Sequence, residues 1–184
     1  MHGSFRQGAR SLRRQAKRMA DIVGQLLNYG RRGTGRHVQV ALHDLLNRVV
    51  REVETEDQRI RFGPQHACAV VHGDPVRLEL AISNLIRNAL RHADRDVEVC
   101  ISKAGGRVLV RVCDDGEGVA DEDRTQIFQP FFTRQPPGCG TGLGLAIVAS
   151  VMHEHDGEVC YEAAPGGGSR FVLSLPDATG QVSR

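Results

Sequence analysis

The sequence contains no tryptophan, and aromatic residues make up only 4% of its 184 residues. No apolar run approaches the roughly 20 residues that a membrane-spanning helix needs, and no secretory signal is visible. The five cysteines are odd in number and form no Cys-x-x-Cys pair, which argues against a disulfide framework or a zinc site. These absences favour one cytoplasmic α/β domain with reduced thiols, of which Cys139 is a candidate reactive one.

Charge is distributed unevenly, although the net charge is only +2. Residues 1–36 carry nine Lys/Arg and one acid, a net +8, and the rest of the chain carries a net −6. Basic arms can bind nucleic acid, but this one lacks interleaved aromatics and any DNA-binding motif. We interpret it as the solvated face of a helix, and we predict no nucleic-acid partner and no membrane contact.

The segment 1–36 is predicted to be a long amphipathic helix followed by a hinge. Its apolar residues recur at alternating spacings of four and three: Leu12, Ala16, Met19, Val23, Leu26 and Gly30. A seam this narrow needs a partner helix, so we expect a homodimer through residues 11–30 or a bundle partner. The glycine-rich segment 30–35 ends the helix.

The rest of the chain alternates between strand and helix patterns. Strands are predicted at 38–41, 67–71, 96–103, 107–113, 158–162 and 169–175, and helices at about 42–54, 74–93 and 144–153. Asp74 and Pro75 begin the longest helix as N-cap and first-turn residue. The pattern predicts an α+β two-layer sandwich of about five mixed strands and three helices. We assign it to residues 37–176, with a tail at 177–184.

Glycines at alternate positions lead into the last predicted helix. They are Gly138, Gly140, Gly142 and Gly144. Glycine lets successive N–H groups point into one concavity, and the following helix adds unpaired amides and a positive dipole end. The segment suits a polyphosphate. It is neither a Walker A motif nor a dinucleotide fingerprint, so it needs the rest of a nucleotide site upstream.

Two upstream segments supply such groups. Asn84 and Asn88 lie four apart and share one helix face, and their amide oxygens suit Mg²⁺ already surrounded by phosphates and water. Asp114 ends an apolar strand, where a carboxylate can accept a hydrogen bond from the adenine amine. Gly116 would leave room for the base and Gly118 would allow the turn. The alternatives are a pair of surface asparagines and an ordinary Asp-Gly turn.

Four motifs, in this order, resemble the N, G1, F and G2 boxes of the catalytic ATP-binding domain of sensor histidine kinases. They are Asn-Leu-Ile-Arg-Asn-Ala (84–89), Asp-Asp-Gly-Glu-Gly (114–118), Phe-Gln-Pro-Phe-Phe (128–132) and Gly-Thr-Gly-Leu-Gly-Leu (140–145). The resemblance covers residues 37–176 and extends to a superfamily shared with gyrase, a heat-shock chaperone and mismatch-repair ATPases. It implies the Bergerat ATP-binding fold.

The resemblance also implies ATP and Mg²⁺ as ligands. Asn88, helped by Asn84, would ligate Mg²⁺, and Asp114 would select adenine. Arg91 and His92 would contact phosphate or ribose, and Arg91 joins the two asparagines as a catalytic residue. The other residues expected to contact ATP lie in the boxes and the short lid: Gly116, Gly118, Phe131, Phe132, Gly138, Gly140, Thr141, Gly142, Leu143 and Gly144.

One residue separates the chemistries within this superfamily. ATP-hydrolysing members place a glutamate at the position of Asn84, where it activates water. An asparagine cannot act as a general base, so the resemblance implies a phosphodonor that retains ATP for another nucleophile.

None of the eight histidines fits the acceptor motif of a histidine kinase. Residues 11–30 resemble the second helix of the dimerisation domain, so we expect the acceptor helix to be absent and this chain not to phosphorylate itself. The segment His153-Glu-His-Asp156 is not a His-Glu-x-x-His motif, and we predict a solvated helix end there.

The resulting hypothesis is a kinase domain that donates the ATP γ-phosphoryl to a histidine of the same or a partner kinase. A response regulator receiver domain would receive it next, and the parent protein is a candidate for membrane anchoring. Two alternatives remain open. An anti-sigma-type serine kinase shares these boxes, and its product would survive acid. A nucleotide-sensing interaction module would bind ATP without transferring phosphate.

Overall fold

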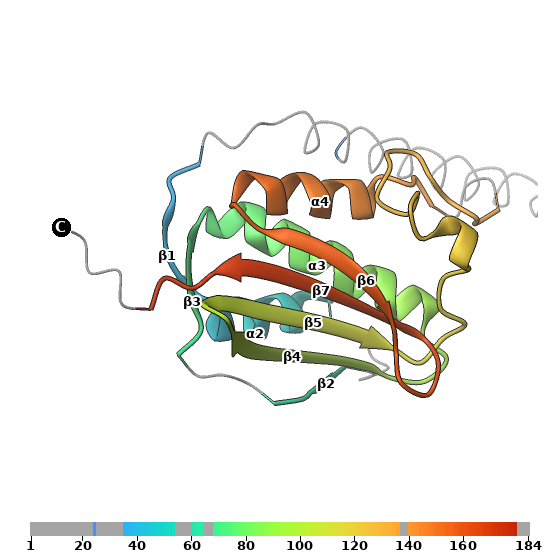
Figure 1. The fold of residues 1–184 in the computed structure, drawn as a ribbon, viewed down its shortest axis with the longest axis horizontal. Coiled ribbons are helices and arrows are strands. Elements are labelled where there is room, and N and C mark those ends of the chain that lie inside the picture. Colours follow the sequence, from blue (N-terminus) through green and yellow to red (C-terminus); the bar gives the residue numbers. More distant parts are fainter. Residues whose placement is uncertain (1–23, 25–34, 54–59, 65–67, 137–139, 180–184) are drawn as a thin grey trace, which may run out of the picture.

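The computed structural model describes residues 24, 35–53, 60–64, 68–136 and 140–179 (Figure 1). The helix expected over residues 11–30 lies outside them apart from Gly24, as do Gly138 and Cys139. The helices are α2 (Leu42–Val53), α3 (Pro75–His92), α4 (Gly144–Glu154) and the 3-10 turn η1 (Asp121–Asp123). The strands are β1 (Val38–Ala41), β2 (Ile60–Phe62), β3 (Val70–Gly73), β4 (Val97–Ala104), β5 (Arg107–Asp114), β6 (Glu158–Ala163) and β7 (Ser169–Pro176).

The three α-helices cover one face of a mixed sheet, which confirms the α+β two-layer sandwich (Figure 1). The five-stranded sheet has the order β2-β4-β5-β7-β6, and only the β2–β4 pair is parallel. β1 and β3 form a separate antiparallel pair. The sequence pattern did not predict β2, because three residues are too few to show an alternating period. The strand expected at 67–71 begins later, at Val70, in register with Ala41.

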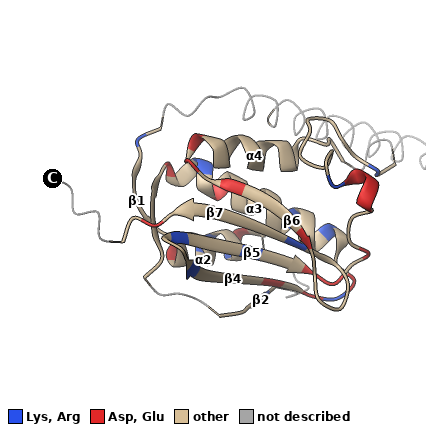
Figure 2. Ribbon diagram, viewed as in Figure 1, with Lys and Arg blue, Asp and Glu red and all other residues tan. Residues whose placement is uncertain are grey.

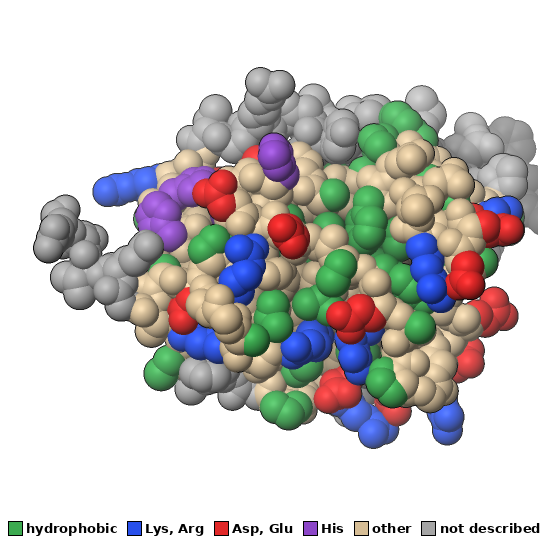
Figure 3. Space-filling model, in the orientation of Figure 1, with side chains coloured by type: hydrophobic (Ala, Val, Ile, Leu, Met, Phe, Trp, Pro, Cys, Tyr) green, Lys and Arg blue, Asp and Glu red, His purple; other side chains and the backbone are tan. Residues whose placement is uncertain are grey.

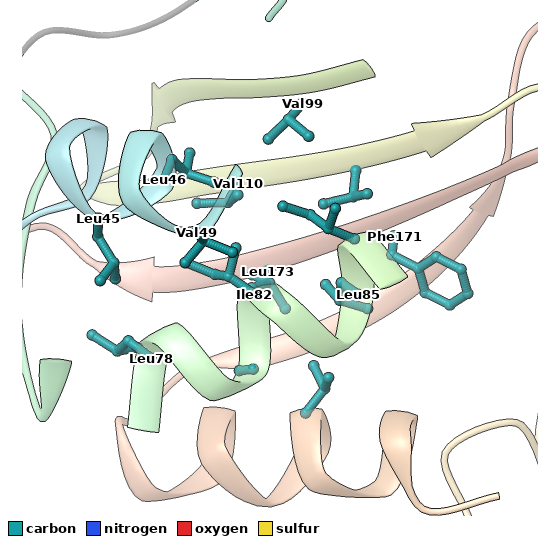
Figure 4. Close-up of a cluster of buried hydrophobic side chains, with 14 of the residues drawn as sticks. Leu45, Leu46, Val49, Leu78, Ile82, Leu85, Val99, Val110, Phe171 and Leu173 are labelled. Atoms are coloured by element: carbon teal, nitrogen blue, oxygen red, sulfur yellow. The ribbon is translucent and has the colours of Figure 1, made fainter. Parts of the chain in front are cut away.

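The core lies between the helices and the inner face of the sheet (Figure 4). Leu78, Ile82 and Leu85 form the predicted apolar stripe of α3 and are at most 1% exposed. Side chains of α2 and of the central strands close over this stripe: Leu45, Leu46, Val49, Val99, Val110 and Leu173. Burying each such side chain contributes roughly 1.5–3 kcal/mol, so this layer positions α3 against the sheet.

Alternation along β5 determines which of its side chains face the helices. Val108, Val110 and Val112 are buried, and the residues between them are half-buried on the other face. Asp114 occupies the next inward position of this two-residue period and is only 4% exposed. The same pattern that builds the core therefore places a carboxylate inside the sandwich, at the end of the strand.

The end of α4 differs from the predicted solvated helix end. His153 is exposed, but His155 is 4% exposed. The His155 Nε2 accepts the Asp74 backbone N–H at 2.9 Å, and its Nδ1 donates to the Val151 carbonyl at 2.7 Å. These two bonds hold a neutral imidazole, and burial lowers the pKa of His155. The His37 ring stacks on it at 4.9 Å, at the end of the molecule where Figure 3 shows histidine side chains beside β1.

Polar contacts join α3 to α4 and attach residues 177–179 to the sheet. Arg77 is buried and pairs with Glu154 across the α3–α4 interface. Lys103 contacts Asp177 at 2.9 Å, and the Thr179 hydroxyl together with Lys103 lowers the pKa of Asp177 to about 2. Residues 177–179 therefore pack against the sandwich. No helix in the described part of the chain is long and apolar enough to cross a membrane.

Candidate functional site

The face of α3 that looks toward α4 carries the two predicted asparagines. The Asn84 Nδ2 donates to the Leu80 carbonyl one turn back, at 2.8 Å. This bond orients the amide so that its Oδ1 would lie 3.4 Å from a Cβ on Gly144, the first residue of α4. Asn88 lies one turn further along the same face of α3 and is partly buried. The Asn84 amide thus borders the N-terminus of α4.

Asp114 presents one satisfied and one unsatisfied oxygen. Its Oδ1 accepts the backbone N–H groups of Gly116 and Ser169, both at 3.2 Å. Its Oδ2 is buried and has no partner among the described residues. Burial raises the pKa of Asp114, against the opposing effect of these N–H bonds and of the Ser169 hydroxyl. A buried acceptor without a donor is costly, and a bound ligand that donates a hydrogen bond would remove this cost.

Close backbone approaches surround this carboxylate. A Cβ on Gly116 would lie 2.0 Å from the His92 carbonyl oxygen, so only glycine fits between the loop and the end of α3. Gly168, at φ +90°, would place a Cβ 2.0 Å from the Asp114 carbonyl oxygen. The loop after β5 is thus held closely between α3 and the β6–β7 turn.

The F-box segment and the glycine loop contact each other through their backbones. The Phe131 N–H donates to the Gly142 carbonyl at 2.9 Å. Gly142 has φ +66°, and a Cβ there would lie 2.4 Å from the Phe131 carbonyl carbon. The Phe131 side chain is 65% exposed, whereas Phe132 packs partly buried against the core. The backbone of Phe131, rather than its ring, therefore holds the glycine loop.

The first turn of α4 has no side-chain cap. Leu143 is the N-cap residue, and its own N–H donates to the Thr141 hydroxyl at 3.3 Å. Leu143 itself is fully buried and anchors the loop to the core. The N–H groups of the first helical turn have no helical acceptor, and with the helix dipole they are suited to bind an anion.

Basic side chains lie at both borders of this site. Arg91 and His92 are exposed in the last turn of α3. Arg134 is not available for a ligand, because it forms a forked contact with Asp123 and a further one with Glu122. These acids belong to the acidic turn η1 (Figure 2), and the contact fixes the loop between η1 and the glycine segment.

The structure thus brings most of the predicted site residues to one end of the sandwich. Asn84 faces Gly144, Gly116 abuts His92, and Gly142 contacts Phe131. Three residues that our sequence analysis did not single out also belong to this end: Ser169, Tyr161 and Gln135. Only Ser169 had a sequence signal, since it follows three glycines. A carboxylate at one end and amides at the other can accommodate an amino-purine nucleotide.

Known proteins share this arrangement. Residues 73–179, more than half of the chain, match the model of the family "Histidine kinase-, DNA gyrase B-, and HSP90-like ATPase". The sensor histidine kinase CpxA of Escherichia coli (strain K12) is 44% identical over 110 residues, which are 58% of this chain and 24% of CpxA. The sensor histidine kinase ZraS of Klebsiella oxytoca is 32% identical over 95% of this chain and 39% of its own length. The chain spans less than half the length of these relatives.

Solved structures agree with this match. The mycobacterial sensor histidine kinase MprB superposes with a TM-score of 0.68 at 28% identity, over 77% of this chain and 97% of that one. Full-length ShkA in complex with AMPPNP superposes with a TM-score of 0.79 at 26% identity, over 94% of this chain and 39% of that one. Fold and sequence agree, and the chain belongs to the family of histidine kinase-, DNA gyrase B- and HSP90-like ATPases.

Proposed function

We propose that this chain binds Mg²⁺-ATP and donates the γ-phosphoryl group to a histidine on a dimerisation-domain helix, for relay to a response regulator. The observation that carries the proposal is the buried Oδ2 of Asp114, an acceptor without a donor among the described residues. The exocyclic amine of adenine supplies that donor. Guanine and hypoxanthine carry a carbonyl oxygen at the same ring position, which would meet the carboxylate acceptor to acceptor.

The triphosphate would extend from the base toward α4. There the uncapped first turn offers N–H groups and a positive dipole end to phosphate oxygens. Asn88 and Asn84 would hold the metal, because the Asn84 Oδ1 already faces the first residue of α4. Mg²⁺ supplies charge neutralisation at the phosphates when bound. Arg91, exposed at the end of α3, would add a mobile positive charge.

Donation is favoured over hydrolysis by the chemistry of Asn84. A water molecule attacking the γ-phosphate needs a group that accepts its proton. The Asn84 amide has no such capacity, and its Nδ2 is occupied by the Leu80 carbonyl. The site would then act by positioning and charge neutralisation, which are the main contributions in phosphoryl transfer.

The nature of the acceptor follows from the relatives, which are named sensor histidine kinases. A histidine acceptor accounts for this pattern better than a serine kinase or a purely nucleotide-sensing module. The acceptor helix would belong to the same or a partner kinase, and residues 11–30 remain a predicted dimerisation helix.

Base selectivity tests the nucleotide site. Calorimetric titrations with ATP and ITP, each with Mg²⁺, should show at least about tenfold tighter binding of ATP, which corresponds to 1.4 kcal/mol. In Asp114→Asn the amide can place its N–H₂ where Oδ2 lies, so the preference should shift toward ITP. Equal binding of both nucleotides by the wild-type chain would remove Asp114 from base recognition.

Transfer tests the kinase activity separately. The chain is incubated with γ-labelled ATP, Mg²⁺ and a dimerisation domain that carries an acceptor histidine. We expect label on that domain that is lost in acid and absent from its His→Gln variant. Acid-stable label would point to a hydroxyl acceptor, and binding without any transfer would favour the sensing module.

A further inference from the structure

The Gln135 side chain lies between the last turn of α3, the glycine loop and the segment after the F box. Its Nε2 is 3.2 Å from the His92 Nε2, in the last turn of α3. A Cβ on Gly140 would lie 2.9 Å from its Oε1, so the amide abuts the start of the glycine loop. Its backbone N–H donates to the Thr133 hydroxyl at 3.1 Å, which fixes the segment after the F box.

This amide has an unsatisfied acceptor, like Asp114 at the other end of the site. The Gln135 Oε1 is buried and has no hydrogen-bond partner among the described residues. His92 engages one of the two Nε2 hydrogens, and the Oε1 still lacks a donor, which a ligand would have to supply. Phosphate oxygens only accept hydrogen bonds, so they cannot satisfy this oxygen. The donors of an adenine nucleotide are the base amine and the ribose hydroxyls.

Position decides between these two donors. The base amine would lie beside Asp114, where the His92 carbonyl packs against Gly116. Gly140 begins the phosphate-binding loop. Gln135 contacts the side chain of His92 and the backbone of Gly140 and therefore lies between base and phosphates, where the sugar of a bound nucleotide must be.

We propose that the Gln135 carboxamide hydrogen-bonds a ribose hydroxyl and makes the site selective for ribonucleotides over deoxyribonucleotides. A ribose hydroxyl can donate to the unsatisfied Oε1. The inference rests on the proposed binding of ATP and assigns a role to a residue outside the four motifs.

Nucleotide titrations of matched variants test this role. ATP, 2′-deoxy-ATP and 3′-deoxy-ATP, each with Mg²⁺, are titrated into the wild-type chain, Gln135→Met and Gln135→Ala. The control is Gln126→Ala, since Gln126 is exposed and its amide bonds back to the Glu122 carbonyl. We expect the wild-type chain to bind one deoxynucleotide about fivefold more weakly than ATP, the ratio of a single net hydrogen bond.

In Gln135→Met and Gln135→Ala the ratio should fall to near one, because ATP binding weakens while binding of that deoxynucleotide stays unchanged. Gln126→Ala should keep the wild-type ratio. A wild-type ratio near one, or a ratio unchanged in either folded Gln135 variant, would overturn the inference. The proposed ATP site fails by a different result, namely equal affinity of the wild-type chain for ATP and ITP. Thermal melting identifies a variant that does not fold, and the wild-type ratio then decides.

Discussion

The Tyr161 hydroxyl on β6 accepts the backbone N–H of Val119 at 3.1 Å and so ties the loop that follows Asp114 to the far edge of the sheet. Gly118 precedes Val119 and has φ +79°. A Cβ added to it would lie 3.4 Å from the Tyr161 hydroxyl oxygen. The Tyr161 ring is fixed in turn by Phe171, edge to face at 5.6 Å. This bond holds the loop that follows Asp114 from the side of β6.

Removing that hydroxyl should loosen the loop without disturbing the core. In Tyr161→Phe the ring contacts remain, and the Val119 N–H loses its partner at a cost of about 1 kcal/mol. We expect the Kd for ATP to rise about fivefold by calorimetry. Cys160→Ala, a change of the exposed neighbour on the opposite face of β6, should leave the Kd unchanged. Equal affinity in Tyr161→Phe would show that the loop is held by its other contacts.

We expect Asp114 to lower the stability of the nucleotide-free domain, although its carboxylate contributes to the proposed binding of ATP. The pKa of Asp114 in the folded state lies above 3.8, its usual value. As pH rises from 3.8 through the folded-state pKa, the folded protein therefore loses stability relative to the unfolded chain. Asp114→Asn keeps an acceptor for the Gly116 and Ser169 N–H groups but carries no charge. Its urea midpoint should exceed that of the wild type near neutral pH, and the difference should shrink toward pH 3.8. A lower midpoint for Asp114→Asn at neutral pH would contradict this reading.

The same substitution should weaken ATP binding by about 2–3 kcal/mol, because the amide presents a donor to the adenine amine. Calorimetry at neutral pH measures the loss. Unchanged affinity with an intact fold would place Asp114 outside the nucleotide site.

Replacing Gly142 by alanine should reduce ATP affinity far more than replacing a glycine of the same backbone conformation elsewhere in the domain. Alanine at Gly142 would force the Phe131 backbone away from a Cβ 2.4 Å distant and displace the glycine loop. Gly105, at φ +57°, has nothing within 4 Å of an added Cβ. We expect Gly105→Ala to cost only about 1–2 kcal/mol of stability from the left-handed conformation, with ATP affinity retained. Gly142→Ala should lose about tenfold or more in ATP affinity.

The buried His155 should make folding stability dependent on pH. Its folded-state pKa lies below 6.5, so the unfolded chain takes up a proton first as pH falls through 6.5, and stability decreases from there downward. The charged groups facing the ring are His37, Glu154 and Asp74. Urea midpoints measured on both sides of pH 6.5 should show this slope in the wild type.

Two variants separate this effect from that of the other histidines. His155→Asn should flatten the dependence, whereas replacing the exposed His153 by Gln should preserve it. An identical slope in His155→Asn would assign the effect to other groups.

Local signals predicted the elements that carry the site. Asp74 caps α3 through the N–H groups of Val76 and Arg77, as the Asp-Pro pair indicates. The β4–β5 hairpin follows its alternating pattern to within one residue at each end. The short strand β2 was not predicted, because it is defined by its parallel pairing with β4. Three residues are too few to show an alternating pattern in the sequence.

His155 shows why the predicted solvated helix end was wrong. A histidine in the last turn of an amphipathic helix is usually solvated. Here it is buried because the Asp74 N–H, 81 residues away in sequence, needs an acceptor at that point. No window of sequence around His155 contains this information.

Sequence periodicity was enough to predict the direction of side chains within one element. Alternation in β5 turns Asp114 inward, and helical spacing places Asn84 and Asn88 on one face of α3. The contacts between residues far apart in the sequence depend on the tertiary structure. Ser169 reaches Asp114 across 55 residues, Tyr161 reaches Val119 across 42, and Gln135 reaches His92 across 43. Periodicity sets the direction of a side chain within its own element, whereas its contact depends on how separate elements pack around the shared core.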